Sequence, residues 1–326
     1  MLLNPERSTN INNNMNLESL KTEPRLLLEA KLNPLAGTRF QPTGFPDLGA
    51  AQYKLPDGTD MLLVESAQSM ANRLEIVCWN TTANDWVTSL AGLPCVVVND
   101  SKDAPLTNSV LEAHRLNSPY IVNTKWFQDF VRAVGFEDGK PFDRQKLVAA
   151  LLKYDINSLV HGIFLEKIAG VIRLPRSLTA FIEAKNITVA ASGGVKNDRV
   201  RATKGAEGQT AKEGFGNVPF HREEFCGEIT AYFTLDLALI RGFGLGAAVE
   251  QLLTALALFK IQRFLRDGLR LRTACDLELQ GTVQVKRPTG FTLPALKEIE
   301  DALPELIKAA AGGFAQPPQT TVKFED

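Results

Sequence analysis

Polar and apolar residues alternate with a period of two in several parts of the chain. In 226–240, for example, polar residues separate Ile229, Ala231 and Phe233. Such alternation is typical of a strand with one buried and one open face. Strands of this kind favour an antiparallel sheet whose helices lie on a single face. The alternating segments are 26–33, 226–240, 273–285 and, with a weaker pattern, 179–189.

Between these strands, apolar residues recur at the spacing of an α-helix, about 3.6 residues per turn. The order along the chain is strand, helix, a mostly helical insertion, two strands, helix and strand. This order predicts an α+β fold built on a split β-α-β unit of the ferredoxin type. A short apolar run at 93–98 is compatible with an additional edge strand. The predicted helices are 62–77, 107–116, 124–134, 144–153, 247–267 and 293–310.

The helix expected over 62–77 has an unusual polar face. Gln68, Ser69, Asn72 and Arg73 share an arc opposite to a stripe of apolar residues. Solvated helix faces are mostly Lys and Glu, because Ser and Asn compete with the backbone for hydrogen bonds and are poorer helix formers. Compact hydrogen-bonding groups therefore indicate either a half-buried helix packed under a loop or a face that binds a polar ligand.

The 326 residues include 36 Lys and Arg against 37 Asp and Glu, which gives a formal net charge of −1. A nearly neutral chain has no global field for nucleic acid or membrane, so any site for a polyanion must be local. With 44% hydrophobic residues, the chain can bury a sizeable core. The four cysteines form no CxxC pair, which favours reduced thiols in a cytoplasmic protein over disulfides or a zinc site.

The first residues, 1–23, are polar and lack an apolar signal core, and we expect a disordered tail there. The most apolar stretch, 252–259, is too short to cross a membrane. A membrane is therefore not an expected partner.

A long loop separates the strands expected at 179–189 and 226–240. Residues 192–224 far exceed what a hairpin needs, and loops of this length are usually functional or disordered. Between 196 and 222, six cations against three carboxylates give a local charge of +3. This loop is the main candidate for a local polyanion site.

Four stretches resemble one known protein family, the backbone subunit (the seventh class of Cas proteins) of type I-U, now I-G, CRISPR effector complexes. That subunit belongs to the RAMP superfamily of modified RNA-recognition folds. The resemblance runs from about residue 24 to about residue 290. The stretches that carry it are 33–53, 61–75, 106–121 and 156–165.

The resemblance implies a single domain over 24–310. It implies a ferredoxin-like or RRM-like palm, a helical insertion at about 101–156 and a long β-hairpin thumb at about 192–224. Residues 311–326 are then a C-terminal tail without an assigned role. The family polymerises head to tail along a guide crRNA, holds its sugar-phosphate backbone whatever the sequence, and presents the spacer to target DNA beside other CRISPR effector subunits. We therefore expect a non-enzymatic RNA-binding protein with no metal and no cofactor.

RNA-contact candidates fall in five groups. The polar face of the 62–77 helix either contacts RNA or packs against the insertion. The turn near 40 either presents a guanidinium to phosphate or is an ordinary turn with a buried Phe, and a helix-end charge interaction explains Arg115 nearly as well. Phe215 or Val218 is a candidate wedge between bases. The candidates are Gln68, Ser69, Asn72 and Arg73; Arg39, Phe40 and Gln41; His114, Arg115 and Asn117; Lys196, Arg199, Arg201 and Lys204; and Arg241.

Two other functions compete with RNA binding. Gly242, Gly244 and Ala247 satisfy GxGxxA, so a nucleotide-dependent α/β enzyme is an alternative, although the preceding alternating strand is unlike a buried Rossmann strand. An RNA-processing endonuclease is the other. Of the three histidines, His114 and His221 lie in no nucleophile motif and His161 is expected in the core.

Two charged surfaces are also predicted. A stripe of cations on the 247–267 helix and just beyond it is either a solvated face or a contact with target DNA or a neighbouring subunit. The polar sheet face is acidic and lacks a base-stacking aromatic pair, so it should repel phosphate and meet a neighbour. The stripe comprises Lys260, Arg263, Arg266 and Arg270, and the acidic face comprises Glu29, Glu183, Glu228, Asp236, Asp276 and Glu278.

Overall fold

The computed structural model describes most of the chain. Of residues 45, 196 and 218–222 it describes the backbone alone. Arg199, Arg201, Lys204 and Phe215 lie outside the described residues, as do the side chains of Lys196 and Val218. The expectations for these residues therefore remain predictions. The described residues are 15–45, 48–137, 140, 142–168, 170, 172–196 and 218–325.

Within the described residues, the main sheet has eight strands. Adjacent strands in it pair antiparallel, as the alternating segments predict. The order is β14-β15-β1-β13-β12-β5-β4, with β16 also pairing with β1. The strands are β1 (Arg25–Pro34), β4 (Gln52–Lys54), β5 (Asp60–Glu65), β12 (Leu178–Lys196), β13 (Val218–Asp236), β14 (Arg270–Arg272), β15 (Cys275–Leu279) and β16 (Gln284–Arg287).

Two helices connect the central strands. Helix α1 (Ala67–Ile76) lies between β1 and β12 in the sequence, and α7 (Ala247–Asp267) lies between β13 and β15. The central order β15-β1-β13-β12 with these two crossovers is that of a split β-α-β unit. This combination of helices with a mainly antiparallel sheet confirms the predicted α+β class.

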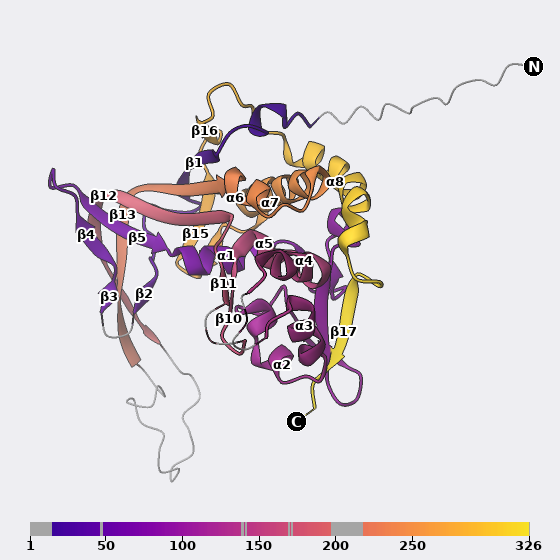
Figure 1. Cartoon of the computed structure of the whole chain (residues 1–326). Coiled ribbons are helices and arrows are strands. Elements are labelled where there is room, and N and C mark those ends of the chain that lie inside the picture. Colours follow the sequence, from indigo (N-terminus) through magenta and orange to yellow (C-terminus); the bar gives the residue numbers. More distant parts are fainter. Residues whose placement is uncertain are drawn as a thin grey trace, which may run out of the picture.

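The core lies between one face of this sheet and the helices. Along β1, the residues from Leu26 to Leu32 alternate between buried and more exposed positions. Phe233 of β13 packs edge-on against Phe264 of α7, with ring centroids 6.4 Å apart. Burying one such apolar side chain stabilises the folded state by about 1.5–3 kcal/mol. Helix α8 (Leu296–Ala310) packs against α7, and Figure 1 shows the two helices side by side.

Several boundaries differ from the sequence prediction. The strand expected over 226–240 ends at Asp236, whose carboxylate accepts a hydrogen bond from the Leu239 amide and caps α6 (Leu237–Gly242). The helix expected over 62–77 begins only at Ala67, because 60–65 pairs in the sheet. The helix expected over 107–116 is absent, since strand β9 (Pro105–Asn108) and turns take its place.

A second part of the molecule contains the short helices and a small sheet. Strand β8 (Cys95–Asn99) is central in that sheet, between β9 and β17 (Gln319–Lys323), so the 93–98 run does not extend the main sheet. The segment expected as a C-terminal tail therefore folds in part as a strand. The helices of this part are α2 (Pro119–Val122), α3 (Trp126–Val134), α4 (Arg144–Tyr154) and α5 (Asn157–His161), with 3₁₀ turns η2 (Thr88–Leu90), η3 (Arg115–Asn117) and η5 (Ala311–Gly313). Another 3₁₀ turn, η1 (Glu18–Leu20), lies near α6 and α7 instead.

Residues 15–23, expected as part of a disordered tail, are described in part as the turn η1, whose Leu20 is buried. Three short hairpins complete the fold. Their strands are β2 (Gly44–Phe45) with β3 (Gly49–Ala50), β6 (Trp79–Asn80) with β7 (Asp85–Trp86), and β10 (Ile163–Leu165) with β11 (Ile172–Leu174).

The strands β12 and β13 form one long hairpin. Their pairing runs from Leu178 opposite Leu235 to Lys196 opposite Val218, with a register shift after Lys185. Beyond this shift the two strands leave the main sheet as a ribbon, which Figure 1 shows projecting beside β2 to β5. Both ends of the segment predicted as a loop, 192–224, are therefore strands of a β-hairpin.

Candidate nucleic-acid interface

A groove with a volume of about 1210 Å³ lies between α1, the segment 113–123 and the β10–β11 hairpin. It brings together candidates from two stretches about 40 residues apart in the sequence. Three cations that the sequence analysis did not select also line it. The candidates in the groove are Gln68, Asn72, His114, Arg115 and Asn117, and the additional cations are Lys167, Arg173 and Arg176.

Helix α1 supplies one side of the groove. Ser66 caps the helix by accepting a hydrogen bond from the Ser69 amide at 3.3 Å. Gln68 is exposed and Asn72 half-buried, and their spacing of four residues places them on one side of the helix. Arg73 points elsewhere: its Nη2 donates to the Leu271 carbonyl at 2.8 Å. The predicted polar arc is thus divided between the groove and a contact with the sheet.

The segment with η3 supplies the opposite side. His114 is exposed, and Asn117 is half-buried with its Oδ1 lacking a hydrogen-bond partner among the described residues. Arg115 is buried, with a left-handed backbone at φ 51°. Its Nε and Nη2 donate to the two carboxylate oxygens of Glu75 at 2.6 and 2.7 Å. This corrects the expectation that Arg115 offers a free charge to RNA.

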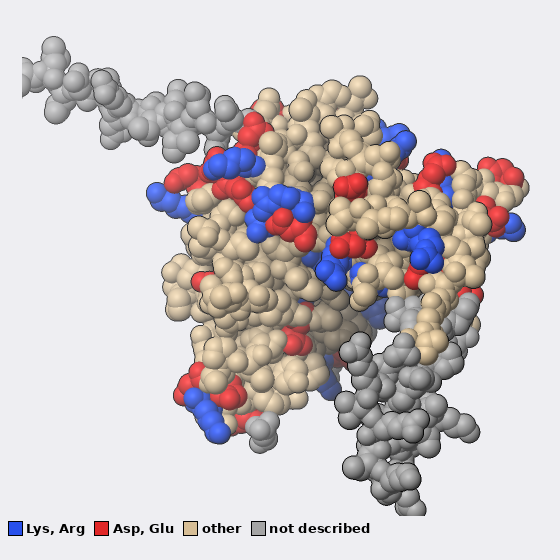
Figure 2. All heavy atoms as spheres, turned by 180° about the vertical axis from the view of Figure 1, so that it is seen from behind, with Lys and Arg blue, Asp and Glu red and all other residues tan. Residues whose placement is uncertain are grey.

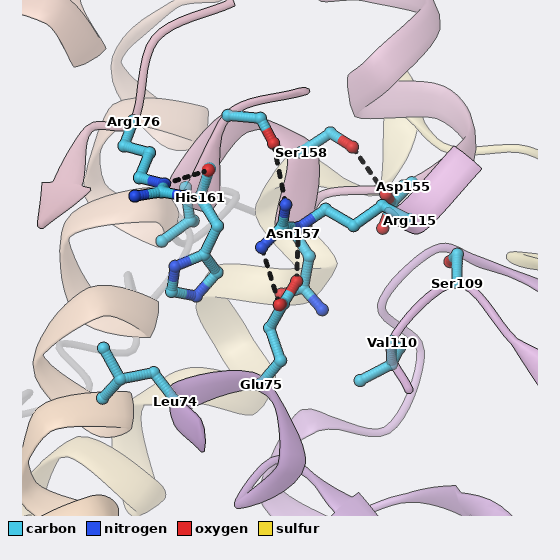
Figure 3. A network of polar contacts seen from close by, with 12 residues as sticks. Leu74, Glu75, Ser109, Val110, Arg115, Asp155, Asn157, Ser158, His161 and Arg176 are labelled. Carbon is cyan, nitrogen blue, oxygen red and sulfur yellow. Dashed lines mark hydrogen bonds and ion pairs between the residues drawn. The ribbon is translucent and has the colours of Figure 1, made fainter. Parts of the chain in front are cut away.

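Below the groove lies a buried polar network, shown in Figure 3. Burial raises the pKa of Glu75, and the neighbouring Arg115 and Lys260 oppose that rise. Lys260 is fully buried and its Nζ donates to the Asn157 side chain at 2.8 Å. Burial also raises the pKa of Asp155 to about 7, although the Ser158 hydroxyl donates to it. These groups connect α1, α5 and α7 with η3.

His161 lies in this network. It is 1% exposed, which confirms its expected place in the core. Both ring nitrogens lack hydrogen-bond partners among the described residues, and burial lowers the pKa of the imidazole. A buried, neutral ring of this kind contributes no charge to the groove.

The β10–β11 hairpin supplies the third side. Arg176, just after β11, is half-buried and donates to the carbonyls of His161 and Ala67 at 3.2 and 3.3 Å. Burial lowers its pKa, and the nearby Arg115 lowers it further. Lys167, Arg173 and Arg176 have no carboxylate within 4.0 Å among the described residues, and Glu166 is the one acidic side chain described along the groove. The groove is therefore locally positive.

Other candidates lie outside the groove. Phe40 is fully buried and its backbone pairs with Phe225, which corrects the expectation of an RNA contact. Arg39 is exposed, 3.6 Å from a carboxylate oxygen of Glu224 at the foot of the ribbon. Gln41 is half-buried, and its carbonyl accepts a hydrogen bond from Arg272. The half-buried Arg241 donates to the Glu23 carbonyl at 2.9 Å.

The structure argues against the GxGxxA alternative and corrects the basic stripe in part. The GxGxxA turn follows helix α6 instead of a strand, so it lacks the geometry of a dinucleotide site. The basic stripe is interrupted because Lys260 is buried, and Arg263 pairs with Asp267 and Glu300 at 2.6 and 3.2 Å. Figure 2 shows acidic and basic side chains interspersed on the face opposite to Figure 1.

The open sheet face also differs from its prediction. Phe181 and Tyr232 lie opposite each other in β12 and β13 and stack with centroids 5.1 Å apart, so an aromatic pair is present after all. Three of the six carboxylates predicted for this face pair with cations among the described residues: Asp236 with Arg25 at 2.6 Å, Glu228 with Lys185 at 3.2 Å and Glu29 with Lys286 at 3.6 Å. The sequence reasoning missed Phe181 because alternation in 179–189 is weak.

Among the residues that the structure describes, no group of three or more His, Cys, Asp or Glu is placed to hold a metal ion. In the same residues, no helix is long and apolar enough to cross a membrane.

Comparison with known proteins gives one family match. Residues 26–189 match the family model described as CRISPR-associated protein GSU0053 (Cas_GSU0053). No curated protein matches the sequence. Among solved structures, a chain titled "CRISPR RNA-guided surveillance complex, pre-nicking" is 12% identical at a TM-score of 0.41, covering 87% of this chain and 89% of that chain. A chain titled "CRISPR RNA-guided surveillance complex" is 13% identical at a TM-score of 0.37, and the match covers 87% of this chain and 84% of that chain. Csc2 of Thermofilum pendens is 9% identical at a TM-score of 0.29, and the match covers 89% of this chain and 81% of that chain.

Proposed function

The chain belongs to the Cas_GSU0053 family of CRISPR-associated proteins, and we propose that it is a non-enzymatic subunit of a Cascade-type effector complex that binds guide crRNA in the groove. It holds the sugar-phosphate backbone and leaves the bases free to pair with target DNA. Copies of the chain assemble head to tail along the guide, beside other effector subunits.

One observation carries this proposal. Polar candidates from 66–73 and 113–117, chosen from the sequence alone, face one another across a locally positive groove. Amide and imidazole groups can donate to or accept from a ribose hydroxyl, and the cations can neutralise phosphates. Asn117 lines this groove beside His114, so its side chain lies where a ribose hydroxyl would pass. Because these contacts address only the backbone, binding is independent of base sequence.

The fold supports the same role. The central strand order β15-β1-β13-β12 fits a ferredoxin-like palm, the part with α2 to α5 fits a helical insertion, and the β12–β13 ribbon fits a thumb. Arg39, at the foot of this ribbon, is an exposed cation that can extend the RNA path toward the thumb. The thumb cations Lys196, Arg199, Arg201 and Lys204 remain part of this proposal.

The first test removes the polar side chains of α1. Gln68→Ala/Asn72→Ala should weaken the binding of a guide transcript about 5- to 150-fold, because two hydrogen bonds contribute together about 1–3 kcal/mol. Alanine favours the helix, so α1 should stay folded. Lys167→Ala should instead change the salt slope, which is the slope of log affinity against log salt concentration. Its magnitude should fall by about 0.7, the value for one phosphate on a single strand. Fluorescence anisotropy over a range of salt concentrations measures both effects.

Matched controls are Gln128→Ala and Lys102→Ala, exposed residues outside the groove. They should bind RNA like the unmodified protein. Gel analysis of the same samples should show the repeat RNA intact after incubation, since the role requires no cleavage. Wild-type affinity and salt slope in the groove variants, or cutting of the RNA, would contradict the proposal.

A further inference from the structure

The β10–β11 hairpin presents an aromatic side chain that its own fold does not need. Ile163 and Leu165 of β10 are buried, and they anchor the hairpin to the core. Phe164 between them faces outward and is 38% exposed. Phe164 also lines the groove, so a ligand held there can contact its ring.

Arg173 lies directly opposite Phe164 in the hairpin ladder. Its guanidinium carbon is 4.3 Å from the centroid of the Phe164 ring, a cation–π contact. Arg173 has no carboxylate within ion-pair distance among the described residues. The pair forms a flat apolar surface with a positive charge at the margin of the groove.

We infer that Phe164 and Arg173 form a stacking site for one unpaired base of the nucleic acid held in the groove. Both a phenyl ring and a guanidinium plane stack on bases, and every base offers a π-face, so the contact is independent of sequence. Lys167 and Arg176 line the same groove and can hold the flanking phosphates. The site thus takes a single-stranded nucleotide, base and phosphate together.

The charges at the site favour a nucleotide over an apolar peptide. The three cations of the hairpin side face one carboxylate, Glu166, within the described groove. A peptide helix or strand that covered Phe164 would bury Arg173 without a counter-ion, which is costly. A phosphate next to a stacked base supplies that counter-ion.

The experiment uses the full chain and a set of guide transcripts, each with 2-aminopurine at a different position. A stacked 2-aminopurine is quenched, so one position or a periodic set should be quenched by the unmodified protein. Phe164→Ala should abolish that quenching and weaken binding about 5- to 150-fold, the usual effect of losing one stacked base. Its salt slope should not change. Phe164→Trp should retain the quenching.

Arg173→Ala should lower the salt slope by about 0.7. Phe142→Ala is the matched control, because Phe142 is also 38% exposed and does not line the groove. Thermal unfolding of each variant establishes that the hairpin remains folded.

This inference rests on the proposed function, and the same transcripts separate their failures. If the unmodified protein binds no RNA, both are wrong. If Gln68→Ala/Asn72→Ala weakens binding while Phe164→Ala behaves like Phe142→Ala, the stacking site alone is wrong. Loss of a protein partner by Phe164→Ala, with RNA binding and quenching intact, would also overturn it.

Discussion

The buried pair of Glu75 and Arg115 gives a sharp test of how the groove is held together. Replacing Arg115 with Met preserves most of the side-chain volume and removes the charge. Glu75, 1% exposed, then loses two hydrogen bonds and its main counter-ion. Breaking a buried pair from one side typically costs about 3–5 kcal/mol. Because Lys260 still acts on Glu75, we expect a loss of unfolding free energy near the lower end of this range.

The loss should depend on pH in a defined direction. Burial already raises the pKa of Glu75, and Arg115 opposes this rise. Without Arg115 the pKa in the folded state rises further, so the folded state holds a proton that the unfolded chain has released. Stability then falls as pH increases from the unfolded value toward the folded one. The deficit of Arg115→Met relative to the unmodified protein should be larger at pH 8 than at pH 5.

Urea unfolding at both pH values measures this effect. Two further variants show whether it comes from the buried ion pair. Glu75→Leu/Arg115→Met removes both charges and should recover most of the lost stability. Arg132→Met removes an exposed cation that pairs with Asp129, and should cost at most about 0.5 kcal/mol. A loss below about 1 kcal/mol for Arg115→Met, equal at both pH values, would refute the reasoning.

Two further predictions concern the same region. Asp155→Asn should flatten the fall in stability between about pH 4 and pH 7, because the unfolded chain releases the Asp155 proton near pH 4 whereas burial raises the folded pKa to about 7. Urea unfolding across the pH series measures the effect, and an unchanged profile contradicts it. Gly162→Ala should destabilise by more than 1 kcal/mol, since φ is 72° and an added Cβ would lie 2.6 Å from the Leu174 carbonyl oxygen; the control Gly58→Ala, also with positive φ but with open space around it, should lose less in thermal unfolding.

The long elements were predictable because their patterns are strong. The helix predicted over 247–267 coincides with α7, and the alternating strands recur in β1, β12, β13 and β15. The errors lie where one side chain changes the local geometry. Asp236 ends a strand by capping a helix, and Ser66 caps a helix that begins five residues later than its apolar periodicity suggests. Capping is a local hydrogen bond that the hydrophobic pattern does not encode.

The sequence analysis predicted some of the residues that line the groove and missed others. Gln68 and Asn72 were predicted from the unusual polar face of their helix, and His114 and Asn117 from the stretch 106–121 that carries the family resemblance. The β10–β11 hairpin was missed because its strands have three residues each, too short for a periodic signal. Arg115 was misjudged for another reason: its partner Glu75 is 40 positions away and becomes buried only in the fold.

The correction for Arg115 also explains how the groove keeps its shape. A left-handed backbone at an Arg is unfavourable, and it persists only where other contacts outweigh it. Here both oxygens of Glu75 and the Gly162 carbonyl hold the guanidinium, so one side chain joins α1, η3 and the start of the β10–β11 hairpin. These are the three elements that line the groove. If the groove binds RNA as proposed, a change at Arg115 should therefore weaken that binding by displacing His114 and Asn117.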